Sequence, residues 1–437
     1  DVYKRQHEYL LPLAKAFLDE GDKRYLDKAK AIVDSWIDAC PRERGGVAWD
    51  PYVISMRIVS WLAFRAELDD ALRTDDAFCE RINASLAEQY VHLSQHLEKD
   101  LLANHYLENL KALAILACYF GDRKTLELAL PMLKAQVNEQ VLDDGMHFEL
   151  SPMYQKIVLE DLMRAAIVLR DSGFGEHAEA FKLQQMCDCL YSMERGIDRT
   201  PLFNDCGDNV AKSRDALLLC ARERFGVVPE FHGVLKNSGY CILERQTKAG
   251  FVKVIFDAGK PGPAYAMGHV HCDALSFECF VDGGPWIVNC GTFAYQDAKR
   301  LEFKKTHSHS TVMVNGEEQH ECWAPFRVAR YSTGAVEDSA ATIVRGALLQ
   351  CGGKCKVVRE IVLEADGLRV VDHLVGDGCI ERAFVFARDV PEADGQIDEV
   401  AYAPEFGVYR DSCRIISQPA NSHEVYFTYP RYKKAVI

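Results

Sequence analysis

The sequence has no long hydrophobic run and is short of positive charge. None of its 437 residues belongs to an apolar run of about 18 or more, the length that predicts a membrane-spanning helix. Lys and Arg number 51 against 65 Asp and Glu, which gives a net charge of −14. So acidic a chain cannot neutralise a phosphate backbone or an anionic lipid surface. We therefore predict a protein that binds no nucleic acid and has no membrane span.

The sequence also lacks the paired cysteine spacing of a structural zinc site. Its 16 cysteines are scattered, and the close pairs are Cys187 with Cys189 and Cys351 with Cys355. Unpaired thiols favour a reducing compartment such as the cytoplasm. The chain contains no signal peptide, but it begins with Asp1 and enters a helical pattern almost at once. We therefore expect a fragment whose leader would lie upstream.

Two periodicities divide the chain. From about residue 8 to 225 apolar residues recur with helical spacing, in stripes separated by short Gly-Asp or Ser-Gly breaks, which is typical of antiparallel helical hairpins. After Pro229, short alternating segments separated by Gly-, Asp- and Asn-rich turns indicate strands. We predict an α+β protein, with an α/α toroid over 1–232 and an antiparallel β-sandwich over 233–437. Two separate helical bundles would give the same helical pattern.

The expected elements can be given as ranges. After two helical stripes between residues 9 and 37, the expected helices are 55–68, 78–97, 105–119, 124–141, 153–171 and 176–193. The expected strands are 238–244, 250–257, 275–281, 285–290, 311–314, 357–364, 368–375 and 382–386.

A histidine-rich stretch opens the second half with GHVHCDALSF. His269, His271 and Asp273 are two residues apart, and residues two apart share one face of a strand. Leu275 and Phe277 continue that face into apolar sequence, so we expect a strand that mounts a polar site on a core. The alternative is that the histidines decorate a solvated face.

The helical half carries two polar stretches of its own. In NHYLEN, His105 and Glu108 share a helical face, whereas Asn104 is either a functional side chain or the N-cap of its helix. In DGMHFELSPMYQ, Pro152 is expected to start a helix with Tyr154 in its first turn, where the ring either packs or reacts. A later loop, PLFNDCGDN, carries further candidates, Asn204 and Asp205.

Taken together, these stretches resemble the heparinase II/III family of bacterial polysaccharide lyases. The matching pieces are, in order, WDPYVISMRIVSWL, NHYLEN, DGMHFELSPMY, PLFNDCGD, GHVHCDALSF, GTFAY, the run from Arg300 to Thr311, and NGEEQHECWAPFR. The resemblance implies a toroid followed by a β-sandwich, a periplasmic or extracellular enzyme, and an acidic polysaccharide substrate. It also implies cleavage of uronic-acid glycans by β-elimination.

The resemblance implies a role for each group that elimination requires. Asn104 and His105 match the residues that neutralise the uronate carboxylate, and Tyr154 matches the acid that protonates the leaving O4. The base is either Tyr295 or His269, since both are present. A tyrosine base requires a pKa well below its free value of about 10, which a neighbouring cation would supply. The residues expected to bind substrate are Glu108, Glu149, Asn204, Asp205, Arg300, Trp323 and Arg327.

The family also carries a metal, commonly zinc held by two histidines and an aspartate. His271 and His309 match the histidines, but Asn289 stands where the aspartate is expected. An amide oxygen is a poorer zinc ligand than a carboxylate. The resemblance therefore predicts a zinc site that is weakened, that recruits Asp273, or that is empty.

Two rival functions remain on sequence grounds. A toroidal glycoside hydrolase would use two carboxylates, Asp144 with Glu149 or Asp205. A noncatalytic carbohydrate-binding protein would use the same surfaces without turnover. The polar stretches are poor in Arg and Lys, which favours an unsulfated uronate glycan over heparin.

Overall fold

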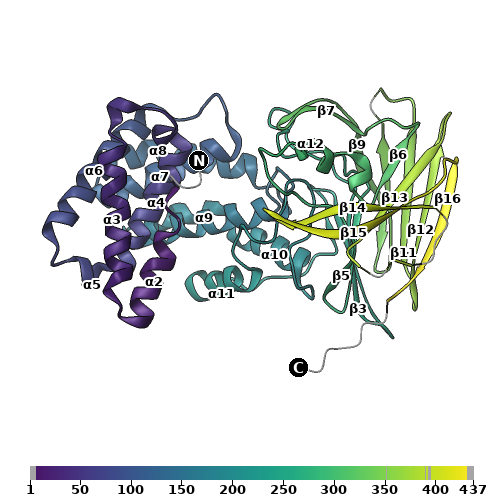
Figure 1. Cartoon of the computed structure of the whole chain (residues 1–437), viewed down its shortest axis with the longest axis horizontal. Helices are drawn as coiled ribbons and strands as arrows, with labels where there is room; N and C mark the ends of the chain where they lie inside the picture. The colour runs from purple at the N-terminus through teal and green to yellow at the C-terminus, as the bar shows by residue number, and fades with distance from the viewer. Residues whose placement is uncertain (1–5, 351, 389, 392–394, 431–437) are drawn as a thin grey trace. The chain divides into compact units, whose positions relative to one another are not determined.

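The structure is a computed structural model that describes residues 6–350, 352–388, 390–391 and 395–430, so Cys351 lies outside it. The chain forms two compact units (Figure 1). The first unit comprises residues 1–138 and 161–181, and the second comprises 139–160 and 182–437. Helices near the middle of the chain thus contribute residues to both units. The domain boundary predicted at 232/233 stays a prediction.

Helices occupy the N-terminal half, as predicted. They are α2 (Leu10–Glu20), α3 (Lys23–Ala39), α4 (Pro51–Glu67), α5 (Asp69–Leu72), α6 (Asp76–Gln95), α7 (Ala103–Phe120), α8 (Arg123–Gln140), α9 (Pro152–Asp171), α10 (Leu183–Glu194) and α11 (Arg214–Phe225). A further short helix, α12 (Arg300–Phe303), lies among the strands of the C-terminal half. Short 3-10 helices lie at Arg42–Arg44, Val47–Trp49, Gly175–Phe181 and Thr306–Ser308. The helix expected over 176–193 is therefore two elements, and α11 was missed because its apolar face is short.

Local sequence explains how the first helices end and pack. α2 ends at Gly21, whose φ of 70° is a left-handed conformation that glycine adopts at little cost. The Asp22 side chain then accepts a hydrogen bond from Arg24 N and caps α3. Trp36 of α3 and Trp61 of α4 pack edge to face with ring centroids 5.4 Å apart. A buried aromatic cluster therefore organises the first unit.

Antiparallel strands form the C-terminal half. They are β1 (Val234–Leu235), β2 (Tyr240–Thr247), β3 (Gly250–Asp257), β4 (Phe277–Val281), β5 (Gly284–Val288), β6 (Val312–Val314), β7 (His320–Ala324), β8 (Arg327–Tyr331), β9 (Thr333–Ala340), β10 (Ile343–Leu349), β11 (Lys356–Leu363), β12 (Gly367–Val375), β13 (Ile380–Phe386), β14 (Gln396–Glu405), β15 (Val408–Ile416) and β16 (Ser422–Thr428). One sheet has the order β1-β2-β3-β4-β5-β13-β15-β14, with β6 also paired to β13, and a second has the order β16-β12-β11-β10-β9. The hairpin β7–β8 is a sheet of its own.

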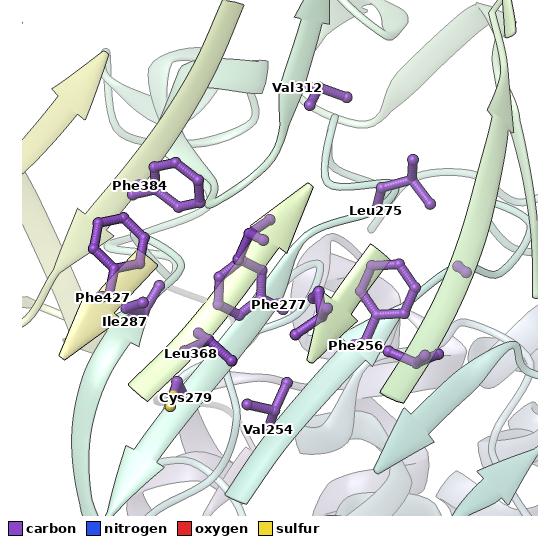
Figure 2. Packing of buried hydrophobic residues seen from close by; sticks show 14 of the residues in the cluster. Val254, Phe256, Leu275, Phe277, Cys279, Ile287, Val312, Leu368, Phe384 and Phe427 are labelled. Atoms are coloured by element: carbon purple, nitrogen blue, oxygen red, sulfur yellow. The ribbon is translucent and has the colours of Figure 1, made fainter. Parts of the chain in front are cut away.

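The core of the second unit lies between these two sheets (Figure 2). Phe277 and Phe384 of the larger sheet pack edge to face with centroids 6.1 Å apart, and Phe384 meets Phe427 of the smaller sheet at 5.0 Å. Leu368 of β12 belongs to the same buried cluster. Burying each such side chain contributes about 1.5–3 kcal/mol. This packing makes the second unit a rigid support for the loops at its edge.

The strand predicted through His269, His271 and Asp273 does not form, and this prediction was wrong. Residues 267–276 make turns and a loop before β4. Their peptide groups bond to other loops, as when His271 N donates to Asn204 Oδ1 and Cys272 N donates to Lys304 O. The alternation of polar and apolar residues therefore reflects side chains directed at separate partners, not a pleated strand.

The described cysteines form no disulfide bonds with one another. Among the helices of the described ranges, none is long and apolar enough to cross a bilayer.

Candidate active site

Two tyrosine hydroxyls meet in the second unit. Tyr154 Oη and Tyr295 Oη are 2.9 Å apart, although the residues are separated by 141 positions in the chain. Tyr154 lies in the first turn of α9, where its backbone N donates to Ser151 Oγ at 3.3 Å. Tyr295 lies in the turn between β5 and α12. Pro152 begins α9 as predicted, and this start brings the Tyr154 ring to the pair.

His269 lies beside both tyrosines. Its ring centroid is 4.4 Å from that of Tyr154 and 5.9 Å from that of Tyr295. Its Nδ1 is 2.8 Å from Asp205 Oδ2, and its Nε2 is 3.9 Å from Glu149 Oε2. Both ring nitrogens of His269 therefore face carboxylates.

Asp205 is the centre of the polar network. Arg300 donates from both terminal nitrogens to the two carboxylate oxygens, and His271 Nε2 lies 2.8 Å from Oδ1. Burial raises the pKa of Asp205, but the Arg300 charge and the hydrogen bonds from His269 and His271 hold it well below its usual value. Asp205 is therefore a buried, permanently ionised anchor that orients His269 and Arg300.

The pKa values of Tyr154 and His269 are both shifted upward. Burial raises the pKa of Tyr154 well above 10, and the neighbouring Tyr295 and Glu149 raise it further. Tyr154 therefore stays a neutral proton donor. Burial lowers the pKa of His269, but the Glu149 charge and the hydrogen bond to Asp205 outweigh it, so the net shift is upward.

Asn204 braces residues 267–276, the loop that carries His269 and His271 and is called the histidine loop below. Its backbone N donates to Asp273 Oδ2 at 2.8 Å, its Oδ1 accepts from His271 N at 3.0 Å, and its Nδ2 donates to Leu150 O at 3.1 Å. The residue is buried and has a φ of 55°, which asparagine tolerates better than most residues. Burial raises the pKa of Asp273 to about 6. Both side chains hold the loop in place in this structure.

The residues predicted to hold zinc lie behind Asp205. The His271 and His309 rings are 5.2 Å apart, and burial lowers the pKa of both, so they are neutral imidazoles of the kind that ligates metals. Among the described residues, none hydrogen-bonds to His271 Nδ1 and no side chain hydrogen-bonds to His309. Asn289 instead accepts from Ser310 N at 3.2 Å.

These residues supply two nitrogen ligands but not the carboxylate that the family resemblance implies. In the described part of the chain, no group of three His, Cys, Asp or Glu side chains is placed to hold a metal ion. The set that is present therefore does not fit the expected ligand set. Zinc stays a prediction, and no step of the mechanism below is assigned to it.

The remaining polar candidates belong to the first unit. Asn104 is the second residue of α7, whose N-cap is Leu102, so the N-cap alternative was wrong. His105 Nδ1 lies 3.1 Å from Glu98 Oε1, and its ring stacks on Tyr52 with centroids 4.3 Å apart.

Glu108 has a partner inside the first unit. Lys111 Nζ contacts both Glu108 and Asp161, and all three side chains are buried. Burial and the neighbouring Asp161 raise the pKa of Glu108 well above its usual value. Its predicted role in substrate binding stays a prediction.

The hairpin β7–β8 supplies a residue that sequence reasoning missed. Trp323 and Arg327, the predicted binders, are both exposed. Phe326, between them in the same WAPFR run, is the side chain that reaches the site, with its ring 5.5 Å from that of Tyr295 and 6.3 Å from that of His269. Lys304 was also missed; its Nζ donates to Gly268 O at 3.0 Å, next to His269. The sequence offered two indications: Phe326 is an aromatic residue next to Pro325, and Lys304 lies shortly before His307 and His309.

The structure therefore brings together most of the candidates from the second unit. Tyr154, Tyr295, His269, Glu149, Asp205 and Arg300 form one cluster, with His271 joined to it through Asp205. Asn204 braces it, and His309 and Asn289 lie behind it.

Known proteins are similar to this chain in sequence and in fold. The profile described as Heparinase II/III N-terminus matches residues 4–224, and that described as Heparinase II/III-like, C-terminal, matches residues 231–428. A heparin-sulfate lyase of Pedobacter heparinus is 21% identical over 337 residues, covering 70% of this chain and 50% of the relative. One from Bacteroides stercoris is 20% identical over 361 residues, covering 71% of this chain and 53% of the relative. The chain thus spans about half the length of the curated relatives it matches.

Solved structures agree on the fold. A crystal structure of heparinase III is 16% identical and has a TM-score of 0.74, with 97% of this chain and 76% of that chain covered. A heparan sulfate lyase from Pedobacter heparinus is 16% identical and has a TM-score of 0.64, with 97% and 75% covered. These likenesses show the fold, a helical toroid followed by an antiparallel β-sandwich. Because the two sequence profiles together span nearly the whole chain, this protein belongs to the heparinase II/III family.

Proposed function

We propose that this chain is a polysaccharide lyase that cleaves a uronic-acid-containing glycan by β-elimination. One observation carries the proposal: two tyrosine hydroxyls, of Tyr154 and Tyr295, lie 2.9 Å apart beside His269. Elimination needs a base for the C5 proton and an acid for the departing O4 within reach of one sugar linkage. Two phenols at hydrogen-bond distance supply both groups.

Tyr154 is the acid in this proposal. The C5 proton leaves to the base, the electron pair forms the C4–C5 double bond, the C4–O4 bond breaks, and Tyr154 gives its proton to O4. The raised pKa of Tyr154, caused first by burial, supports this role because the phenol stays protonated until O4 develops charge. Carboxylate neutralisation is assigned to Asn104 and His105 by the family resemblance.

Tyr295 is the base in preference to His269. A carboxylate faces each ring nitrogen of His269, Asp205 at Nδ1 and Glu149 at Nε2, and a carboxylate favours a protonated nitrogen. That environment suits a fixed cation better than a proton acceptor. The Arg300 guanidinium carbon is 5.2 Å from the centre of the Tyr295 ring, and this positive charge favours the phenolate that a tyrosine base requires.

Two of the three carboxylates named for a hydrolase, Asp144 and Asp205, are held by other groups. Asp144 Oδ2 accepts from Asn237 N at 2.8 Å and from Ser238 N at 2.7 Å, so it fastens a loop. The Arg300 charge keeps Asp205 ionised, whereas a hydrolase acid must carry a proton. Neither Asp144 nor Asp205 is suited to the acid step, so a hydrolase would have to use Glu149 as its acid; the tyrosine pair supports elimination as the preferred mechanism.

The substrate class follows from the family and from the charges near the tyrosines. The relatives above are named heparin-sulfate lyases, and an acidic glycosaminoglycan or another uronan is the proposed partner. Arg300 is taken by Asp205, and Lys304 by backbone carbonyls. Few cations near the tyrosines are therefore left for sulfate groups, which supports an unsulfated or lightly sulfated glycan. The resemblance favours the periplasm or the exterior of the cell, the unpaired thiols favour the cytoplasm, and fractionation of host cells decides between them.

The test is elimination itself. Purified protein is incubated with alginate, heparan, hyaluronan and bacterial capsular uronans, and the unsaturated uronate is followed by its near-ultraviolet absorbance. We expect absorbance to rise on at least one polymer. Tyr154→Phe should slow that rise by about 10²–10⁴-fold, because the ring stays but the proton donor is gone. Tyr295→Phe should do the same.

Each alternative gives a different result. Reducing ends that appear without absorbance would indicate the hydrolase, and binding without either product would indicate a carbohydrate-binding protein. If Tyr295→Phe kept full activity while His269→Gln lost it, Tyr295 would not be the base.

A further inference from the structure

The hairpin β7–β8 ends in a tight, rigid tip. Ala324 pairs with Arg327, so Pro325 and Phe326 form a two-residue turn. Neither residue has a positive φ, and proline fixes its own φ near the value that suits the first position of a type I turn. The direction of the Phe326 side chain is therefore set by the turn and does not depend on a long loop.

Phe326 borders the tyrosine pair and remains accessible. Its ring is edge-on to Tyr295 at 5.5 Å and to His269 at 6.3 Å, and the Arg300 guanidinium carbon is 5.5 Å from its centre. The residue nevertheless keeps 39% of its surface exposed. A large aromatic residue that lies beside the proposed base Tyr295 and beside His269 and stays open to solvent is suited to receive the apolar face of a sugar ring.

Lys304 fastens this tip to the histidine loop. Its side chain is fully buried, and its Nζ donates to Gly268 O at 3.0 Å and to Pro325 O at 3.2 Å. One ammonium thus joins the residue before His269 to the residue before Phe326. α12, which ends next to Lys304, and the hairpin are labelled near one another in Figure 1.

Arg327 adds a positive charge to the tip of the hairpin. It is the strand residue that follows Phe326 and is exposed. No carboxylate in the described ranges forms an ion pair with it, unlike Arg330 of the same hairpin, whose Nε is 2.9 Å from Glu321. An unpaired guanidinium next to an open aromatic ring matches a sugar that carries a negative group.

We propose that Phe326 and Arg327 form a subsite for an anionic hexose adjacent to the linkage that is cleaved, and that Lys304 is the positioning residue that holds this subsite against the tyrosine pair. The sugar ring stacks on Phe326, and its carboxylate or sulfate pairs with Arg327. The inference rests on the proposed lyase function for the identity of the neighbouring linkage. Binding at the tip is tested separately from elimination.

The experiment measures binding and turnover in parallel. Unsulfated heparosan, heparan sulfate and alginate tetrasaccharides are titrated by calorimetry into Tyr154→Phe protein, and KM and kcat are measured in the otherwise native chain. Phe326→Ala should raise Kd and KM by about tenfold and leave kcat within about twofold, because a contact made equally in the ground and transition states affects KM alone. Phe326→Trp should restore both.

Two further variants test the role of the Arg327 charge and the role of Lys304. Arg327→Gln should weaken binding of all three probes if the sugar carboxylate is recognised, and of heparan sulfate alone if the sulfate is. Lys304→Met should raise Kd in the native hairpin but add no further loss to Phe326→Ala, since a positioning residue acts only through the group it holds. Arg330→Gln removes a guanidinium of the same hairpin that is already paired with Glu321, so it is the matched control and should change neither constant.

The outcomes separate the two proposals. Unchanged Kd and KM in Phe326→Ala would overturn the subsite. Additive losses of affinity from Phe326→Ala and Lys304→Met would overturn the positioning role of Lys304. Native protein that binds a probe and loses that binding in Phe326→Ala, yet never eliminates, would support the subsite and refute the lyase. Native protein that binds none of the probes would overturn the subsite.

Discussion

Each unit of the molecule buries carboxylates around a cation, and the two clusters end differently. In the first unit, Lys111 contacts Glu108 and Asp161, and none of the three side chains is more than 10% exposed. In the second unit, Arg300 holds Asp205, and the network continues through His269, whose side chain is 16% exposed. The first cluster is sealed, whereas the second reaches two phenols.

The charge balance explains the difference. Two carboxylates share one ammonium in the first unit, so one of them is pushed toward the protonated form, and the pKa of Glu108 rises by burial and by the charge of Asp161. In the second unit a guanidinium and two histidines surround Asp205, and the pKa of that carboxyl falls despite its burial. Two of the partners of Asp205, His269 and Arg300, also lie beside the tyrosines, whereas in the first unit both carboxylates share the single ammonium of Lys111. A buried charge thus indicates function only where the network continues to an accessible group.

Asp205→Asn should have the largest effect and would break the second cluster. An amide cannot balance the buried guanidinium of Arg300, and removal of one partner of a buried pair typically costs about 3–5 kcal/mol. The free energy of unfolding, measured by urea denaturation, should fall by that amount at neutral pH. Elimination activity should be lost as well, because His269 and Arg300 lose their common anchor.

The pH dependence gives the control for Asp205→Asn. The folded pKa of Asp205 lies below its unfolded value of about 3.9, so its contribution is present above that pH and lost as pH falls through the folded pKa. The stability difference between wild type and variant should therefore shrink in acid. A difference that stays constant down to low pH would contradict the ionised-anchor role.

Asn289→Asp should have an intermediate effect and tests the region behind Asp205. His271 and His309 already present neutral imidazoles, and an aspartate would add the missing carboxylate. Zinc affinity should rise at least about tenfold, the smallest change typical of altering even an outer partner of a metal ligand. Metal analysis and the thermal midpoint with zinc or chelator measure it.

Wild-type protein is the reference for the Asn289→Asp experiment. If the wild-type chain binds stoichiometric zinc as tightly as Asn289→Asp, the amide is an adequate ligand and the weakened site predicted from the sequence is wrong. Asn289→Ala then separates a ligand from a residue that only holds Ser310.

Much of the fold was predictable because its patterns are local. The change from helical to strand spacing near Pro229 and the strand at 250–257 were predicted correctly, the latter with the bounds of β3. The strands β9 and β14 were missed because both are largely half-buried or exposed and lack a strong apolar face. The histidine loop was mistaken for a strand because alternation alone does not show where backbone hydrogen bonds go.

Several residues that the structure brings together were named from the sequence, but their arrangement was not predictable. The motifs named Tyr154, His269 and Tyr295, since their residue types suit the chemistry. Asp205 was expected to bind substrate or to serve as a hydrolase carboxylate, but not to anchor His269 and Arg300, because the 64 and 95 residues that separate it from them give no indication of contact. Phe326 was passed over because its role depends on a turn that aims the ring, which composition does not reveal.

Glu108→Gln should have the smallest effect and sharpens the comparison from the other side. The raised pKa of Glu108 means that the folded state favours its protonated form, which glutamine imitates, so unfolding should change by less than about 1 kcal/mol. Above the unfolded pKa, near 4.5, the stability of the wild type should fall as pH rises through the folded pKa, whereas that of the variant should not. Urea denaturation of both proteins across this range measures the gap. A large loss of stability in the variant at low pH would contradict a purely structural role for Glu108 in its buried cluster with Lys111 and Asp161. A rise in KM would favour the substrate-binding role predicted from the sequence.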